Sequence, residues 1–134
     1  MAERRKPGSH TPAPQDFGRL FETKEFTVLD PDGKKIGKVE DIYVGGDQQP
    51  RYLRVTMGAL GMNMTVMPVQ LVTNVDSDEQ AIHLSVPKDV AKSSPTFDLD
   101  HQFKQEDEVT IWEHYGLGRP VDVETEISLW REAS

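Results

Sequence analysis

The fold is decided by the stretch DGKKIGKVEDIYV, residues 32–44. It begins in a turn, because Pro31 fixes φ and Gly33 can adopt a positive φ, a combination that favours a tight reversal. Apolar residues then follow at short intervals: Ile36, Val39, Ile42 and Val44. Gly37 lies among them and leaves room for a bulge or a tight bend. The stretch therefore predicts a hairpin turn followed by a curled strand.

Similar runs lie on both sides of this stretch. Strands are expected at residues 25–29, 51–57, 62–72 and 81–86. The run at 51–57 alternates apolar and polar residues with the period of a half-buried strand. Within the next run, Pro68 cannot donate to a ladder and should lie at an edge or a bulge. Five short strands between Gly, Pro and Asp turns predict a mainly β protein, a small antiparallel barrel, because closure removes sheet edges.

The periodicity changes after these strands. Pro87 suits an early helical position and Pro95 a stop, so a helical turn or two is expected between them. A second helix is expected near residues 104–115, which open with acidic residues, and Gly116 can supply its left-handed cap. The end of the chain, residues 119–134, fits both a strand and a helix, and the sequence leaves the choice open.

Four segments carry a resemblance to a known family: VLDPDGKKIGKVEDIYV (28–44), RYLRV (51–55), VMPVQLV (66–72) and IHLSVPKDVAKSSPTFD (82–98). In this order they resemble the PRC-barrel family, known from the cytoplasmic domain of the photosynthetic reaction centre H subunit and the C-terminal domain of the ribosome maturation factor. The ending WEHYG (112–116) is similar to the extension of many stand-alone bacterial members, which are commonly linked with stress responses. The resemblance implies an adaptor barrel without a defined enzymatic activity.

Three parts of the chain are expected from these patterns. Residues 1–16 form a flexible tail, because this Pro-, Gly-, Ser- and Thr-rich segment lacks the apolar residues that would offset the entropy of ordering it. Residues 17–98 form the PRC-barrel domain. Residues 99–134 form a C-terminal extension that contains the second helix.

Composition excludes several classes of function. The 134 residues contain no cysteine, which rules out disulfides, thiolate metal sites and a cysteine nucleophile. The net charge of −8 repels a phosphate backbone, so direct nucleic-acid binding is disfavoured. No run of about 18 apolar residues or signal peptide is present, which predicts a cytoplasmic protein without a membrane partner.

The residues that commonly carry chemistry form no recognisable site. The four histidines are scattered, and none pairs with another at the spacing of a helical metal site. Asp98, Asp100 and His101 are close in sequence, but helix entry and turn capping explain them as well as metal binding does. There is no GxSxG, GxGxxG or P-loop motif. We therefore predict no catalytic, cofactor or metal residues, and no enzyme.

The remaining candidates are apolar residues suited to a protein interface. Met64 and Met67 cannot share one side of a regular strand, so at least one should lie outside or at a bulge. Val109, Trp112 and Tyr115 form an apolar helical stripe. These five residues predict a protein-interaction module that self-associates and binds a further protein. The stripe can pack on its own barrel within one chain or across a two-fold axis in a homodimer, and the dimer is favoured. The alternative is a ribosome- or RNA-associated assembly factor, which only the kinship with the maturation factor suggests.

Overall fold

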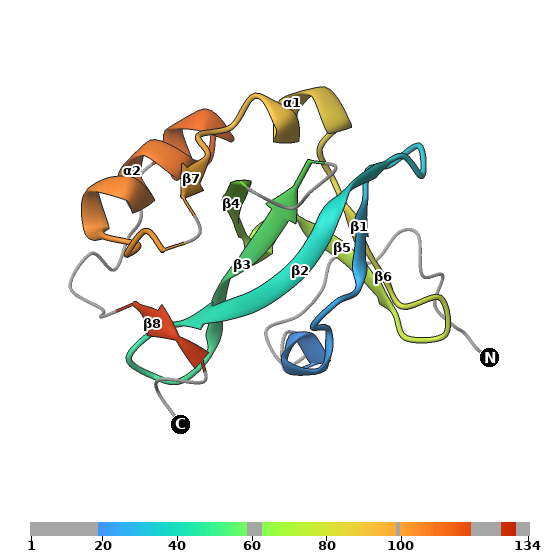
Figure 1. Ribbon diagram of the computed structural model, residues 1–134, viewed down its shortest axis with the longest axis horizontal. Helices are drawn as coiled ribbons and strands as arrows, with labels where there is room; N and C mark the ends of the chain where they lie inside the picture. The colour runs from blue at the N-terminus through green and yellow to red at the C-terminus, as the bar shows by residue number, and fades with distance from the viewer. Residues whose placement is uncertain (1–18, 59–62, 99, 119–126, 131–134) are drawn as a thin grey trace.

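The structure is a computed structural model that describes residues 19–58, 63–98, 100–118 and 127–130 (Figure 1). The predicted tail lies outside these residues. The strands are β1 (Thr27–Leu29), β2 (Lys35–Val44), β3 (Pro50–Met57), β4 (Asn63–Pro68), β5 (Val72–Asp76), β6 (Ala81–Leu84), β7 (Phe97–Asp98) and β8 (Ser128–Leu129). The helices are the 3₁₀ turn η3 (Val69–Leu71), α1 (Lys88–Lys92) and α2 (Gln105–His114).

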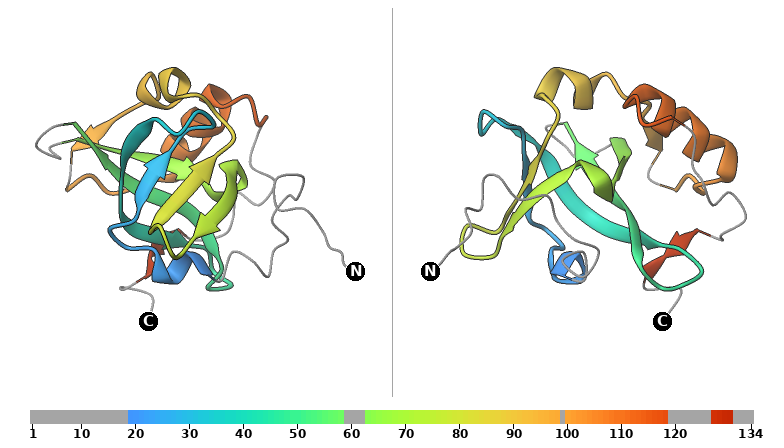
Figure 2. Two further views of the ribbon diagram at one scale, coloured as in Figure 1. Left: turned by 90° about the vertical axis from the view of Figure 1, so that its right-hand side faces the viewer. Right: turned by 180° about the vertical axis from the view of Figure 1, so that it is seen from behind.

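All eight strands belong to one strongly curved sheet (Figures 1 and 2). Its order is β5-β6-β1-β2-β3-β4-β7, and β8 pairs with the end of β2. The mainly β prediction is therefore confirmed. The expectation of a wholly antiparallel sheet is wrong, because β1 and β6 are parallel. Among the strands that the structure describes, the end strands β5 and β7 do not pair with each other, so the sheet curls without closing.

The turn between β1 and β2 forms where the sequence predicts it. Gly33 adopts a φ of +82°, which a residue with a Cβ rarely tolerates. The carboxylate of Asp30 accepts backbone hydrogen bonds from Asp32 and Lys34 through one oxygen and from Lys88 through the other. Asp30 thus fixes the turn and joins it to the first residue of α1.

Gly37 lies in β2, tightly packed against β3. A Cβ at this position would lie 2.3 Å from the carbonyl oxygen of Thr56, and only a residue without a side chain fits there. The register of β1 against β2 also shifts between Val28 and Leu29, opposite this glycine. The bulge expected at Gly37 is present in this pairing.

The predicted fourth strand is two strands. β4 ends at Pro68, the turn η3 follows, and β5 leaves in a new direction to pair with β6. Proline has no backbone N–H for the ladder, so the pairing of β4 with β3 stops at this residue. At the C-terminus, Ser128 and Leu129 pair with β2, which resolves the open choice in favour of a strand for these residues.

Both faces of the sheet are covered. The larger cluster, here called the first core, lies on the concave face: Leu20, Phe26, Val28, Ile36, Val39, Ile42, Val44, Leu53, Val55, Met57, Met67, Val69, Leu71, Val72, Ile82, Leu84 and Ala91. The second core lies under α2 and the segment before it: Tyr43, Tyr52, Met64, Val66, Phe103 and Ile111. The half-buried character expected for residues 51–57 is wrong, because Tyr52 and Arg54, on the face that alternation leaves outside, are buried as well.

Candidate binding pocket

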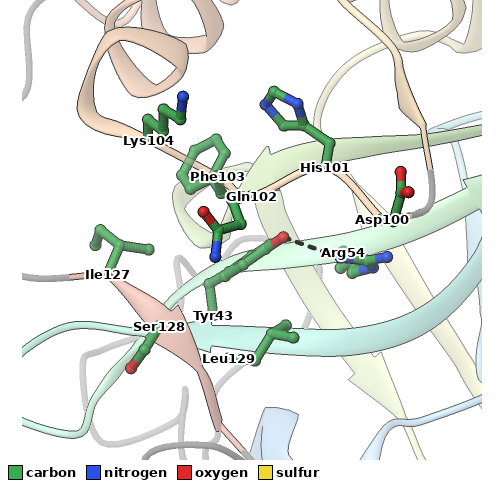
Figure 3. A pocket seen from close by; sticks show the side chains of 10 residues that line it. All are labelled: Tyr43, Arg54, Asp100, His101, Gln102, Phe103, Lys104, Ile127, Ser128 and Leu129. Carbon is green, nitrogen blue, oxygen red and sulfur yellow. Dashed lines mark hydrogen bonds between the residues drawn. The ribbon is translucent and has the colours of Figure 1, made fainter.

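A pocket of about 560 Å³ lies beside the second core, between the sheet and the C-terminal extension (Figure 3). Its floor comes from β2 and β3, its rim from the segment that precedes α2, and one wall from β8. The lining residues are Tyr43, Arg54, Asp100, His101, Gln102, Phe103, Lys104, Ile127, Ser128 and Leu129. This volume is within the range of small-ligand sites in proteins.

The floor consists of a tyrosine and a buried arginine on neighbouring strands. Arg54 is 7% exposed, and its Nη1 donates a hydrogen bond of 3.2 Å to the hydroxyl of Tyr43. The Nε of Arg54 lies 2.5 Å from a carboxylate oxygen of Glu40. Burial raises the pKa of Tyr43 above its usual value, and the hydrogen bond from Arg54 offsets this only in part. The Tyr43 hydroxyl therefore stays protonated at neutral pH.

The rim is ordered by contacts with the first turn of α2. The ring Nε2 of His101 lies 2.8 Å from a carboxylate oxygen of Asp107, and the same oxygen accepts the backbone N–H of Lys104 at 2.9 Å. The His101 ring also stacks on Phe97 of β7, with centroids 4.7 Å apart. His101 thus helps to cap α2. Across the part of the chain that the structure describes, no three His, Asp or Glu residues form a group able to hold a metal.

Apolar side chains complete the pocket. Ile127 and Leu129 flank Ser128 of β8 and supply one wall, while Phe103 belongs both to the pocket lining and to the second core. The Phe103 ring packs against Tyr43 and Tyr52, with centroids 5.0 Å away in both cases. The pocket therefore combines an apolar side with polar and charged groups, an arrangement that can bind an amphipathic ligand.

A buried polar chain attaches α2 to the sheet behind the pocket. The indole N–H of Trp112 donates to the Tyr52 hydroxyl at 2.7 Å, and this hydroxyl donates to the carboxylate of Glu108. Glu108 is 6% exposed. Burial raises the pKa of Tyr52 above its usual value, and the hydrogen bond to Glu108 and its charge raise it further. The rim of the pocket is thereby held on a helix that is anchored through Tyr52.

The five residues predicted for an interface are not gathered in this pocket. Met64 and Met67 are both fully buried, on opposite sides of β4, in the second and the first core. The expectation that one of them lies outside is wrong, although the alternation behind it is correct. Trp112 and Tyr115 pack against the second core of their own chain, and Val109 is partly exposed. The buried residues of α2 are Glu108 and Ile111.

The residues that line the floor were not identified from the sequence. Arg54 falls between Leu53 and Val55 in a strand that alternates apolar and polar residues, so its pattern places the charged side chain in water. Residues 100–104, distant in sequence, line the same pocket as Arg54. Neither periodicity nor a local motif predicts that arrangement.

Comparison with known proteins identifies one domain. The family model of the PRC-barrel domain matches residues 16–91, which is more than half of the chain. No curated protein matches the chain. The match ends before residues 100–118 and 127–130, which provide the rim and the wall of the pocket. Among the described residues, no helix has the length and apolar character needed to cross a membrane.

Proposed function

The chain belongs to the PRC-barrel domain family, and on this premise we propose that it is a non-enzymatic adaptor that binds another protein through the pocket beside β8. We take the curved sheet to be the barrel of the family, with residues beyond the match as an added cover. A cytoplasmic role in bacterial stress responses is the setting that the resemblance suggests.

One observation carries the proposal. The pocket is assembled from two parts of the chain, the sheet and the extension, and its apolar and charged side chains are close together. Interfaces bind most strongly where an apolar anchor enters a desolvated pocket with polar groups at its rim. The pocket at β8 has both elements, and the nearby rings of Phe103, Tyr43 and Tyr52 make its base stiff.

The test is to block the pocket mouth without disturbing the fold. Gln102 is exposed and lines the pocket, so Gln102→Trp fills its mouth. Gln49 is exposed in the turn before β3 and lies outside the lining, so Gln49→Trp adds the same side chain elsewhere. Proteins that crosslink to the wild-type chain and to Gln49→Trp, but not to Gln102→Trp, would support the proposal. Equal crosslinking to all three would contradict it.

The salt dependence of binding distinguishes the protein adaptor from the alternative, an RNA-associated factor. If the chain is instead a ribosome- or RNA-associated factor, its binding to RNA weakens steeply as salt rises, because phosphate contacts release counterions. Association with a protein through an apolar anchor changes little over the same range. The net charge of −8 favours the protein partner. We also propose self-association as a symmetric dimer, through residues other than those packed inside the chain.

A further inference from the structure

We propose that the pocket recognises a carboxylate group attached next to an aliphatic or aromatic group, as at the C-terminus of a peptide that ends in an apolar residue. The inference rests on the proposed function, because it names the chemistry of the partner that the pocket would bind. Two features of the pocket support it: the donor on its floor and its apolar wall.

The donor is the hydroxyl of Tyr43. This oxygen accepts a hydrogen bond from the Arg54 guanidinium, so its own hydrogen is left to donate to a further group. Donation from a buried cation makes the hydroxyl a stronger donor, because hydrogen bonds in series polarise one another. A ligand oxygen above Tyr43 would receive that hydrogen bond, and an anionic oxygen would receive it most favourably. Arg54 acts here through Tyr43, because the Glu40 carboxylate offsets its charge.

The charges of the lining are close to balanced. Of the ten lining residues, Arg54 and Lys104 are cationic and Asp100 is acidic, and the Glu40 carboxylate, 2.5 Å from the Nε of Arg54, offsets the charge of Arg54. The carboxylates of the first turn of α2 are directed elsewhere: Asp107 to His101 and the Lys104 backbone, Glu108 to Tyr52. Lys104 is exposed at the rim (Figure 3). An anion above Tyr43 would meet the hydroxyl donor, with the charge of Lys104 at the rim of the same pocket.

The apolar wall determines what accompanies the carboxylate. Ile127 and Leu129 line one side of the pocket, which has a volume of about 560 Å³ (Figure 3). An inorganic anion would leave these side chains without a partner. A C-terminal Leu or Phe carries its carboxylate and its apolar side chain on a single Cα, so it can satisfy both sides of the pocket. Asp100 limits the position of the carboxylate, because like charges repel.

The experiment uses the full chain and three defined probes. An acetylated tetrapeptide that ends in leucine, the same peptide with an amidated C-terminus, and 4-methylpentanoate are titrated while the backbone amide signals are followed by NMR. We expect the free peptide to shift the signals of Tyr43, Gln102 and Lys104, with a Kd of about 1 mM or tighter. The amidated peptide should bind at least about tenfold more weakly. Stronger binding of 4-methylpentanoate than of the peptide would identify a small acid as the source of the carboxylate.

Variants of the lining residues test whether the pocket prefers an anionic or a cationic ligand. Tyr43→Phe, which keeps the ring, should weaken binding of the free peptide about tenfold, and Lys104→Gln about threefold. Asp100→Asn should strengthen it, because it removes the one acidic lining residue. Matched controls outside the pocket are Tyr115→Phe for the hydroxyl and the exposed Lys92→Gln for the charge, and both should leave binding unchanged.

The outcomes are distinct for the two proposals. Weaker binding for Asp100→Asn together with stronger binding for Lys104→Gln would show that the pocket prefers a cation and would overturn the inference. The absence of any shift at Tyr43, Gln102 and Lys104 with all three probes would overturn it as well. If protein crosslinking still depends on an open pocket mouth at Gln102, the adaptor function stands while the carboxylate chemistry fails. Urea unfolding of each variant confirms that a change in binding occurs in a folded chain.

Discussion

The hydroxyl of Tyr52 donates a hydrogen bond to the carboxylate of Glu108, so a strand of the sheet and the helix of the extension share one buried polar contact. The two residues are 56 positions apart in the sequence. A buried carboxylate is costly unless it is hydrogen-bonded, and its removal leaves the donor without its partner. The contact therefore links the stability of α2 to that of β3.

A double-mutant cycle measures this link. Tyr52→Phe and Glu108→Gln should each lower the free energy of unfolding by about 1.5–3 kcal/mol, the usual range for a hydrogen bond to a charged group. The double variant should lose less than the sum of the two, because both changes remove the same contact. Urea denaturation provides the values. The exposed Glu113→Gln on the same helix is the control and should change stability by less than about 0.5 kcal/mol. Strict additivity would show that the contact does not form.

Alkaline unfolding follows from the same tyrosine. Burial raises the pKa of Tyr52, and the hydrogen bond to Glu108 and its charge raise it further. The unfolded chain loses this proton first, near the ordinary tyrosine pKa of about 10. The stabilisation is therefore complete below about pH 10 and is lost as the pH rises above it. Tyr52→Phe should make the alkaline fall in stability shallower, although burial also raises the pKa of Tyr43 and Tyr115. An unchanged slope in this variant would contradict the assignment.

Acid unfolding should depend on Asp30. Burial raises the pKa of Asp30, but the backbone N–H groups of Lys34, Lys88 and Asp32 outweigh this effect, and the net shift is downward. The unfolded chain then binds the proton first as the pH falls, near about pH 3.9. The contribution of Asp30 is present above that pH and is lost as the pH falls through its folded pKa. Asp30→Asn should lower the melting temperature at pH 7 and flatten its acid dependence. The exposed Asp32→Asn, in the same turn, should do neither.

Gly37 provides a steric test of the sheet. A methyl group added at this position would lie 2.3 Å from the Thr56 carbonyl oxygen and 2.9 Å from a Val55 methyl, and the backbones of β2 and β3 would have to separate. Gly37→Ala should lower the free energy of unfolding by about 2–4 kcal/mol. The exposed neighbour Lys38→Ala should change it by less than about 0.5 kcal/mol. A tolerated alanine would mean that β2 and β3 are further apart than the structure places them.

The sequence predicts the local elements well, because turn residues and apolar runs act locally. Gly33 and Gly116 both have the positive φ expected of them, at +82° and +69°. The interior of the sheet was also predictable in part, since Leu53 belongs to a regularly alternating strand. The parallel pairing of β1 with β6 was not predictable, because the apolar pattern of these short strands fits parallel and antiparallel pairing equally.

The candidate site was not predictable, for a physical reason. Tyr43 and Arg54 lie on the face of the sheet that alternation assigns to water, and residues 100–104 join them around the pocket only after the chain has folded. The apolar stripe of α2 was identified, but its buried face includes Glu108, which pattern analysis assigns to solvent. Burial of a charged residue depends on a distant partner, in this case Tyr52.

The last prediction concerns the contribution of Trp112 to stability and the oligomeric state of the chain. Trp112 packs on the second core of its own chain and donates its indole N–H to Tyr52. Trp112→Ala should lower the free energy of unfolding by about 3 kcal/mol, because it loses apolar contacts and leaves a cavity. Trp112→Phe keeps most of the ring and should lose only about 1 kcal/mol, for the hydrogen bond. Urea denaturation checks both values.

The mass measured by light scattering on the same proteins shows whether Trp112 belongs to the core of one chain or to an interface between two chains. We expect the wild-type chain to have twice the mass of one 15.1 kDa chain, as in a symmetric dimer. Trp112→Phe should have the same mass as the wild type at every concentration, since the side chain contacts its own sheet. A concentration-independent mass of one chain for the wild type would defeat the dimer and leave the role of Trp112 intact. A dimeric wild type with a monomeric but equally stable Trp112→Phe would instead place this side chain at the interface between two copies.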